Sequence, residues 1–182
     1  MKSLLARLSF IVLLFAVLSS CSEKQDFGQY NDLELTPTFE ASILYIEAPE
    51  SSINSVSDTT FISTNFSFEA FSEKAFAKRV IDGVIVYEVE NTTSKLLRIT
   101  IEFLDGDANV LDTEIFLIDP VSTSILRREI VYGDTGRSIE IIKNTSGLSL
   151  SASNLGDNTS ISNLPDPKIT LKSFGKFRVR IK

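Results

Sequence analysis

The sequence predicts an all-β protein, built as a two-sheet antiparallel sandwich with one or two short helices. From Phe39 onward, apolar and polar residues alternate with a period of two, which is typical of strands with one buried face. Turn-forming residues interrupt this alternation often, so the chain divides into seven or eight short strands. The chain is 43% apolar and has one cysteine, so the core must hold by packing, without an internal disulfide.

The strands follow one another with short connections. The clearest is residues 97–103, where every second side chain is apolar and those between are polar. Polar loops are expected at residues 51–60 and 154–167. The strands predicted from the alternation are, in chain order, residues 41–46, 61–68, 84–91, 97–103, 110–118, 125–132, 148–152 and 168–181, the last bent near Phe174-Gly175.

Two segments change from strand to helical spacing. Phe68, Phe71 and Ala75 predict a short helix over residues 72–80, which Asp82-Gly83 would end. Residues 138–143 contain three isoleucines that suit a strand. Because Ile139 and Ile142 lie three apart and Gly147 could end a helix, a helix of one or two turns is preferred.

The middle of the chain resembles immunoglobulin-like and fibronectin-III-like modules of bacterial envelope proteins. The residues that carry the resemblance are Glu88-Val89-Glu90-Asn91-Thr92, Ile99-Thr100-Ile101-Glu102-Phe103-Leu104-Asp105 and Val110-Leu111-Asp112. They cover about a quarter of the chain after residue 20, contain no catalytic signature, and imply an immunoglobulin-like sandwich. A fold resemblance of this kind does not transfer function.

The N-terminus has the layout of a secretory signal peptide. Lys2 and Arg7 give a basic start, an apolar run follows from Leu8 to Leu18, and small residues lead to Cys21. The run is too short for a stable membrane span, which needs about 20 apolar residues. Residues 1–20 are therefore expected to be removed after export.

Leu18-Ser19-Ser20-Cys21 resembles the lipobox of bacterial lipoproteins. The resemblance implies that Cys21 receives a diacylglycerol on its sulfur and, after cleavage, an acyl chain on its new N-terminus. The whole chain also resembles uncharacterised flavobacterial lipoproteins, which implies a location in the cell envelope, at the outer membrane. The alternative is an ordinary signal peptide followed by a free cysteine.

Three regions follow from these observations: a lipoprotein signal peptide (1–20), an acidic tether (21–38) and a β-sandwich domain (39–182). The tether could span about 60 Å when fully extended. After removal of residues 1–20 the chain carries 16 basic and 24 acidic side chains, a net charge of −8. This argues against a nucleic-acid partner, which requires a basic face.

Composition also restricts the chemistry. There is no histidine, so the usual general base near neutral pH is missing, and metal sites built from histidine or several cysteines are excluded. No cofactor is expected. Only carboxylate, hydroxyl, lysine or tyrosine chemistry remains, and the sequence favours a protein that is not an enzyme.

Two short motifs are candidate sites. Asp105, Asp107 and Asn109 alternate as calcium ligands do, but Val110 and Phe116 replace the Gly and Glu of an EF-hand loop. A hairpin turn with solvated carboxylates explains them better, and a weak calcium site is the alternative. Asp58-Thr59-Thr60 resembles the O-glycosylation acceptor of Bacteroidota envelope proteins, which makes Thr59 the candidate residue.

Three other features have structural explanations. Asp134-Thr135-Gly136 matches the aspartic-protease triplet, but no second copy exists and a turn suits it equally well. Glu88 and Glu90 share a strand face as glycosidase carboxylates could, though such pairs are usually just solvated. The last strand carries an outward basic row that could meet anionic lipid headgroups, and protection of an edge strand is the preferred explanation. That row is Lys176, Arg178, Arg180 and Lys182.

The sequence therefore favours a lipid-anchored envelope protein whose sandwich binds or scaffolds. The expected partners are the membrane, through the N-terminal lipid, and an envelope protein or polysaccharide. The alternative is an accessory glycan-binding lipoprotein of a polysaccharide-uptake system. With no Trp and four Tyr, the stock of aromatic platforms for sugars is small.

Overall fold

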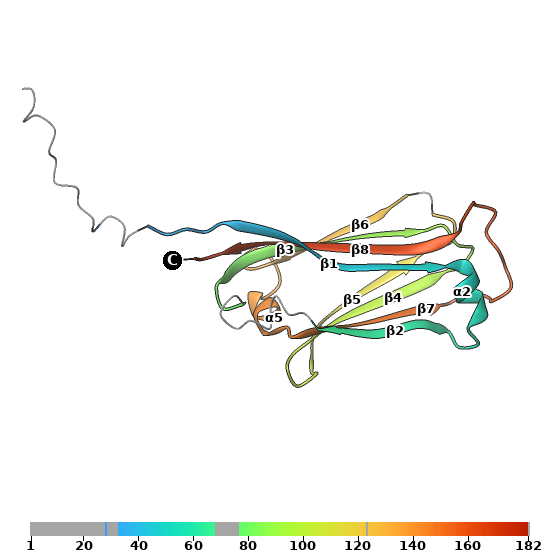
Figure 1. Cartoon of the computed structure of the whole chain (residues 1–182), viewed down its shortest axis with the longest axis horizontal. Helices are drawn as coiled ribbons and strands as arrows, with labels where there is room; N and C mark the ends of the chain where they lie inside the picture. Colours follow the sequence, from blue (N-terminus) through green and yellow to red (C-terminus); the bar gives the residue numbers. More distant parts are fainter. Residues whose placement is uncertain (1–27, 29–32, 68–76, 123, 182) are drawn as a thin grey trace, which may run out of the picture. The chain divides into compact units, whose positions relative to one another are not determined.

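The computed structural model describes residues 28, 33–67, 77–122 and 124–181 (Figure 1). Contacts divide the chain into two units, Met1–Glu34 and Leu35–Lys182. The first unit lies almost wholly outside the described residues, so Cys21 is not described. The second unit is the sandwich. Among the described residues, no helix is both long enough and apolar enough to cross a membrane.

Two four-stranded antiparallel sheets form the sandwich (Figure 1). Sheet A has the order β1-β8-β3-β6, and sheet B has the order β2-β7-β4-β5. The strands are β1 (Thr38–Pro49), β2 (Thr60–Ser67), β3 (Val80–Asn91), β4 (Leu97–Leu104), β5 (Val110–Ile118), β6 (Leu126–Tyr132), β7 (Gly147–Asn154) and β8 (Lys168–Val179). The predicted fold class, a two-sheet antiparallel sandwich with short helices, is confirmed.

The strand order adds a detail that alternation does not supply. The hydrogen-bonded neighbours include β1 with β8, β2 with β7, β3 with β6, and β4 with β5. Nested pairing of this kind is the jelly-roll form of sandwich. Sandwich domains share one architecture without always sharing one topology, so the immunoglobulin-like prediction holds at the level of architecture.

The core lies between the two sheets, as the alternation predicts. On β3, Ile85, Tyr87 and Val89 are each at most 1% exposed, and every second residue of β4 from Leu97 to Phe103 is at most 3% exposed. The alternation also assigns Leu126 and Ile181 to the inward side of the strands predicted over residues 125–132 and 168–181. This assignment is wrong, because the two residues are 36% and 48% exposed. Leu126 begins an edge strand, and Ile181 follows the last residue of β8, so neither has neighbours on all sides.

Of the predicted helices, the second is confirmed as α5 (Ile139–Asn144). The first, residues 72–80, lies mostly outside the described residues. Its end is wrong, because Val80 already begins β3 and Asp82-Gly83 are part of that strand. A register shift between Val80 and Asp82 in the pairing with β8 lets the strand start early.

The predicted loop at residues 51–60 contains a helix, α2 (Glu50–Ser55), so this part of the prediction is wrong. Ile53 is 1% exposed and joins the core, which anchors the helix. Ile53 and Val56 are the only apolar residues of this polar run, which is too few to give a periodic signal. The second predicted loop, 154–167, is confirmed apart from Asn154, which ends β7.

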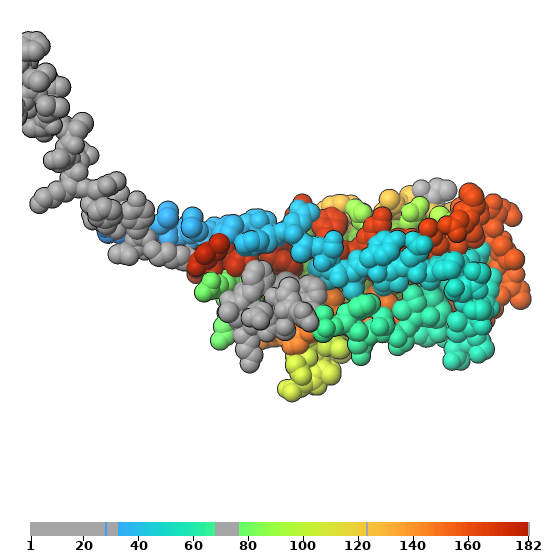
Figure 2. Space-filling model, in the orientation of Figure 1, coloured from blue at the N-terminus to red at the C-terminus, as the bar shows by residue number. Residues whose placement is uncertain are grey.

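The two ends of the sandwich differ. At one end, which we call the entry end, the first residues of β1 pair with the last of β8, Thr38 opposite Arg178. The carbonyl of Leu35 accepts a bond from the Ile181 amide there, at 2.9 Å. At the opposite, far end, α2 and the 155–167 loop lie side by side (Figure 2).

Candidate functional site

A cluster of polar side chains lies at the far end. Glu50, in the first turn of α2, is 2% exposed. Its carboxylate accepts hydrogen bonds from the Ser94 amide and hydroxyl, both 2.6 Å, and from the Ser162 amide, 2.8 Å. Burial alone would raise the pKa of Glu50, but the bonds from Ser94 and Ser162 outweigh it and hold the pKa below its usual value.

Lys95 is the second member of this far-end cluster, and its side chain is 0% exposed. Its Nζ donates to the Ser160 hydroxyl at 2.7 Å, the Ser160 carbonyl at 2.8 Å and Asp157 Oδ1 at 3.3 Å. Amide bonds from Ser160 and Thr159 hold the pKa of Asp157 far below its usual value. Asp157 is thus an ionised partner for Lys95.

A buried lysine beside a serine hydroxyl can be the base of a hydrolase, provided that the lysine is neutral. Here the Lys95 side chain is the donor in all three of its bonds, to the Asp157 carboxylate and to both oxygens of Ser160. The Ser94 hydroxyl in turn donates to Glu50. The cluster therefore fastens the 92–96 turn, α2 and the 155–167 loop together.

A second buried cluster closes one side of the sandwich between edge strands β5 and β6. Glu114 is 2% exposed and pairs with Arg137 and, at 3.2 Å, with Arg128. Arg137 also pairs with Asp112 at 2.6 Å. The Arg128 guanidinium lies 4.3 Å from the centre of the Phe116 ring. The two arginines link sheet A to sheet B, so both carboxylates serve the fold.

The entry end carries a basic cleft of about 430 Å³. Residues from three parts of the chain bring their cations to it: the segment before β3, helix α5, and the segment after β8. The residues that line the cleft are Lys78, Arg79, Val80, Ile81, Lys143, Arg180 and Ile181. No acidic residue is among them. These cations lie up to 102 positions apart in the sequence, from Lys78 to Arg180, so no local sequence motif predicts that they come together.

The basic row predicted on the last strand is divided in the structure. β8 lies between β1 and β3, so the explanation of a protected edge strand is wrong. Lys176 pairs with Glu40 at 3.3 Å and Arg178 pairs with Asp82, both across the outer face of sheet A. Arg180 instead lines the basic cleft. Lys182 lies outside the described residues.

The outer face of sheet B is rich in short hydroxyl side chains. Because the alternate residues of β7 are buried, Ser149, Ser151 and Ser153 face outward. The register places the outward residues of the four strands in three rows. These rows are Thr60-Ser153-Arg98-Leu117, Ser63-Ser151-Thr100-Ile115 and Asn65-Ser149-Glu102-Thr113.

The Asp105 motif forms a turn between β4 and β5. Asp105 Oδ1 accepts bonds from the Asp107 amide at 2.9 Å and the Asn109 amide at 2.8 Å. Asn109 also turns its side-chain nitrogen toward Asp105, at 3.0 Å from Oδ2. These bonds, above all those from Asn109, lower the pKa of Asp105. Within the described residues, no group of three or more acidic or cysteine side chains could hold a metal ion.

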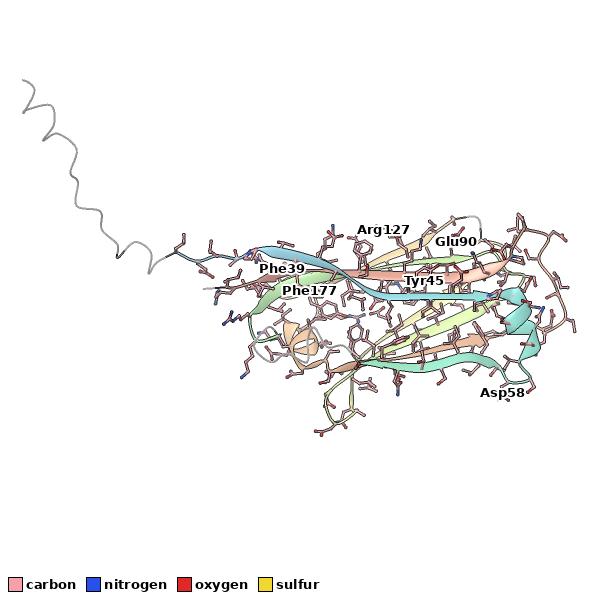
Figure 3. All side chains as sticks on the ribbon, viewed as in Figure 1. Phe39, Tyr45, Asp58, Glu90, Arg127 and Phe177 are labelled. Atoms are coloured by element: carbon pink, nitrogen blue, oxygen red, sulfur yellow. The ribbon has the colours of Figure 1, made fainter. Side chains whose placement is uncertain are left out.

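The remaining candidate residues lie apart from one another. Asp134-Thr135-Gly136 lies in the turn after β6, closed by the Gly136 amide on the Gly133 carbonyl. Glu88 pairs with Arg127 at 3.0 Å, whereas Glu90 is exposed (Figure 3). Thr59 is exposed at the far end, next to Asp58, so an enzyme could reach it. Its glycosylation stays a prediction, as does the lipidation of Cys21.

Comparison with known proteins gives little beyond the fold. No protein-family profile matches the chain, and no curated protein sequence matches it. It is similar to the subviral particle of VP2 of infectious bursal disease virus, with 11% identity and a TM-score of 0.39 over 79% of this chain and 32% of that chain. The chain thus spans about a third of that protein.

Two further solved structures are similar over most of their own length. A Bacillus endospore appendage pilus protein shares 8% identity at a TM-score of 0.36, over 88% of this chain and 96% of that one. Turnip yellow mosaic virus shares 9% identity at a TM-score of 0.37, over 82% of each chain. At these scores the similarities carry no argument about function.

Proposed function

We propose that this protein is a lipid-anchored protein of the cell envelope, held at the outer membrane, whose sandwich works by binding or scaffolding. The observation that carries the proposal is the order of features in residues 1–21. A basic start, a short apolar run and Leu18-Ser19-Ser20-Cys21 follow one another as in a bacterial lipoprotein signal. Two or more acyl chains hold a protein stably at a membrane, where one chain does not.

The direction in which the chain enters the sandwich supports this proposal. The compact unit begins at Leu35, and residues 21–34 could extend to about 45 Å. An anchor at Cys21 would therefore connect to the entry end, while α2, the 155–167 loop and Thr59 lie at the far end.

The state of the reactive groups supports a role without catalysis. Glu50 and Asp112 each accept hydrogen bonds from two residues, Glu114 forms ion pairs with two arginines, and Lys95 donates to Asp157 and Ser160. General acid–base catalysis needs a group whose proton is free to move to a substrate. In the described part of the chain, the contacts of these ionisable groups join segments of the fold to one another.

Cell fractionation of the native chain and a Cys21→Ser variant tests the anchoring. We expect the native protein in the membrane fraction, resistant to a high-salt wash, and the variant in the soluble fraction or retained as an uncleaved precursor. A Ser20→Ala variant is the matched control, because it keeps both a small residue and the cysteine. Equal retention of the Cys21→Ser variant after cleavage would contradict the proposal.

The outer face of sheet B favours a second candidate function, glycan binding. Its rows of Ser, Thr and Asn side chains could donate to and accept from sugar hydroxyls without an aromatic platform. Of the described tyrosines, Tyr87 and Tyr132 are buried and only Tyr45 is exposed, at 62%, on the other sheet. A sugar bound at this face therefore has no described tyrosine ring on which to stack.

A glycan array separates the two candidates. If sheet B binds sugars, a Ser151→Arg substitution in the middle of the face should abolish the signal, whereas Lys172→Gln on sheet A should leave it unchanged. If the native protein binds no glycan, scaffolding remains as the function.

A further inference from the structure

Strand β2 forms one edge of sheet B, and its composition differs from that of the other edges. Of the four edge strands that the structure describes, it alone contains no charged residue. Its sequence is TFISTNFS (Thr60–Ser67), without proline or glycine, and its Thr, Phe and Ile residues favour extended backbone. An edge strand has a row of N–H and C=O groups that no neighbouring strand pairs, so it can accept a further strand.

The other three edges carry features that oppose further pairing. β1 contains two glutamates and a bulge in its pairing with β8. On β5, the Ile115 carbonyl accepts a bond from the Arg128 side chain at 2.9 Å. On β6, the Val131 carbonyl accepts one from the Arg137 amide at 2.8 Å. Charges, bulges and covered edge groups are the usual means by which a sheet edge avoids another strand.

The inner side of β2 is only partly covered. Ile62, Thr64 and Phe66 pair with three residues of β7 that are each at most 2% exposed. Thr64 is nevertheless exposed, and Ile62 and Phe66 are half-buried where they face the core. Figure 2 shows β2 at the surface of the molecule, on the side that it forms with β1. A strand added at this edge would cover the three side chains.

A second copy of β2 matches this edge when it runs antiparallel about a twofold axis at Thr64. The pairing with β7 is regular from Ile62 onward, so residues 62–66 are available as straight strand. In this register Ile62 lies opposite Phe66 of the second copy, Ser63 opposite Asn65, and Thr64 opposite its own counterpart. Pairs of aromatic with β-branched side chains and Thr–Thr pairs stabilise antiparallel strands. Because β2 is uncharged, no like charges meet within the two strands.

We propose that two copies of this protein associate through β2, in an antiparallel pairing that joins their two B sheets into one continuous sheet. The contact is isologous, so it closes as a dimer and does not continue into a fibre. One strand from each copy makes an interface at the low end of the usual size range, so the dimer should be weak and depend on concentration. The proposal goes beyond the lipid anchoring of Cys21 and does not depend on it.

Disulfide trapping of cysteine variants tests this pairing even when the dimer is weak. The chain from residue 21 with Cys21→Ser has no other cysteine and keeps every described residue. In the proposed dimer the two Cα atoms at position 64 lie about 5 Å apart, within the range that a disulfide bridges. Thr64→Cys should therefore give a cross-linked dimer on mild oxidation. Thr113→Cys is the matched control, because Thr113 is exposed on β5, the opposite edge of sheet B. Its yield of dimer should be about tenfold lower.

Two further variants test the register. Ser63→Cys alone, or Asn65→Cys alone, would place its two cysteines about 8 Å apart across the axis, which is too far for a disulfide. A mixture of the two proteins would bring Cα 63 of one copy opposite Cα 65 of the other. We expect the mixture to give cross-linked heterodimers and each protein alone to give few dimers.

Sedimentation equilibrium of the chain from residue 21 with Cys21→Ser tests the association without a cross-link. The average mass should rise with protein concentration. Thr64→Lys should remove this rise, because two lysines would meet across the axis, whereas Thr113→Lys should leave it unchanged. Thr64 and Thr113 are both exposed, and equal urea midpoints of the two variants would show that both remain folded.

Three outcomes would overturn the proposal. The first is the absence of a cross-link at Thr64→Cys, which would show that this edge does not meet a second copy. The second is an equal yield from Thr64→Cys and Thr113→Cys, which would indicate random collision. The third is cross-linking of Ser63→Cys or Asn65→Cys alone as strongly as of their mixture, which would exclude the twofold axis at Thr64.

Discussion

Glu50 shows how one residue can join three separate segments of this fold. It begins α2, its carboxylate accepts from Ser94 and Ser162, and its own amide donates to the Pro167 carbonyl at 2.8 Å. A buried carboxylate is stable only when its oxygens are satisfied in this way. Glu50 therefore ties the far-end loops to the sandwich, and this role depends on its charge.

The pH dependence of stability should report on Glu50 and Asp157. The pKa of each is lower in the folded protein than the value of about 4 expected in the unfolded chain. Their stabilisation should be fully present above about pH 5 and be lost as the pH falls through the folded values. A Glu50→Gln substitution should lower the free energy of unfolding by about 1–3 kcal/mol at pH 7. As the pH falls, the free energy of unfolding of the variant should then decrease less than that of the native protein.

Urea unfolding at pH 7, 5 and 3 measures this effect. Glu102→Gln is the matched control, because Glu102 lies on the outer face of sheet B, and it should keep the native pH slope. If the free energy of unfolding of the Glu50→Gln variant had the same pH dependence as that of the native protein, the charge of Glu50 would not contribute to stability.

Gly83 and Gly175 leave room for the ring of Phe177. A Cβ atom added at either glycine would overlap that ring, which lies against both β3 and its own strand β8 (Figure 3). The extra residue in β1, between Ser42 and Leu44, lies opposite this part of β8. The bend predicted near Phe174-Gly175 thus corresponds to a bulge in the neighbouring strand.

Gly175→Ala should lower the free energy of unfolding by about 1–3 kcal/mol through overpacking. Combined with Phe177→Leu, it should cost less than the sum of the two single substitutions, because the shorter side chain vacates the space. Gly106→Ala is the control, since its Cβ would meet only the Ser146 hydroxyl, at 3.7 Å. Urea unfolding of the two single variants and the double variant measures this. If the double variant lost as much free energy of unfolding as the two single variants together, the steric explanation would be contradicted.

At the scale of elements, the alternation of residues identified the strands and their buried faces. β3 and β4 have the inward residues that the sequence predicts, because both are interior strands with neighbours on each side. The same reasoning failed for α2, where Ile53 alone contacts the core. It also could not find the far-end cluster or the basic cleft, since their members are brought together by loops rather than by spacing along the chain.

The edge strands β5 and β6 depend on the buried charges between them. Removing one member of a buried ion pair leaves the others uncompensated, so Glu114→Ala should cost about 3 kcal/mol. Glu102→Ala, on the outer face of the adjacent strand, should change stability by less than about 0.5 kcal/mol. Similar urea midpoints for the two variants would show that water, rather than Glu114, compensates the charges of Arg128 and Arg137.

At the scale of the whole molecule, the sequence predicts the sandwich but leaves its strand order open. Alternation decides which face of a strand is buried, and it does not decide which strand pairs with which. The pairing of β1 with β8 places the start and the end of the sandwich at the same end, beside the basic cleft.

The proposed anchoring requires that an acylated Cys21 is the N-terminus of the mature protein. Mass spectrometry of the N-terminal peptide from the native membrane fraction tests it most directly. We expect a peptide that begins at Cys21 and carries a diacylglycerol on sulfur and an acyl chain on nitrogen. A peptide that begins elsewhere, or that carries Cys21 with a free thiol, would contradict it.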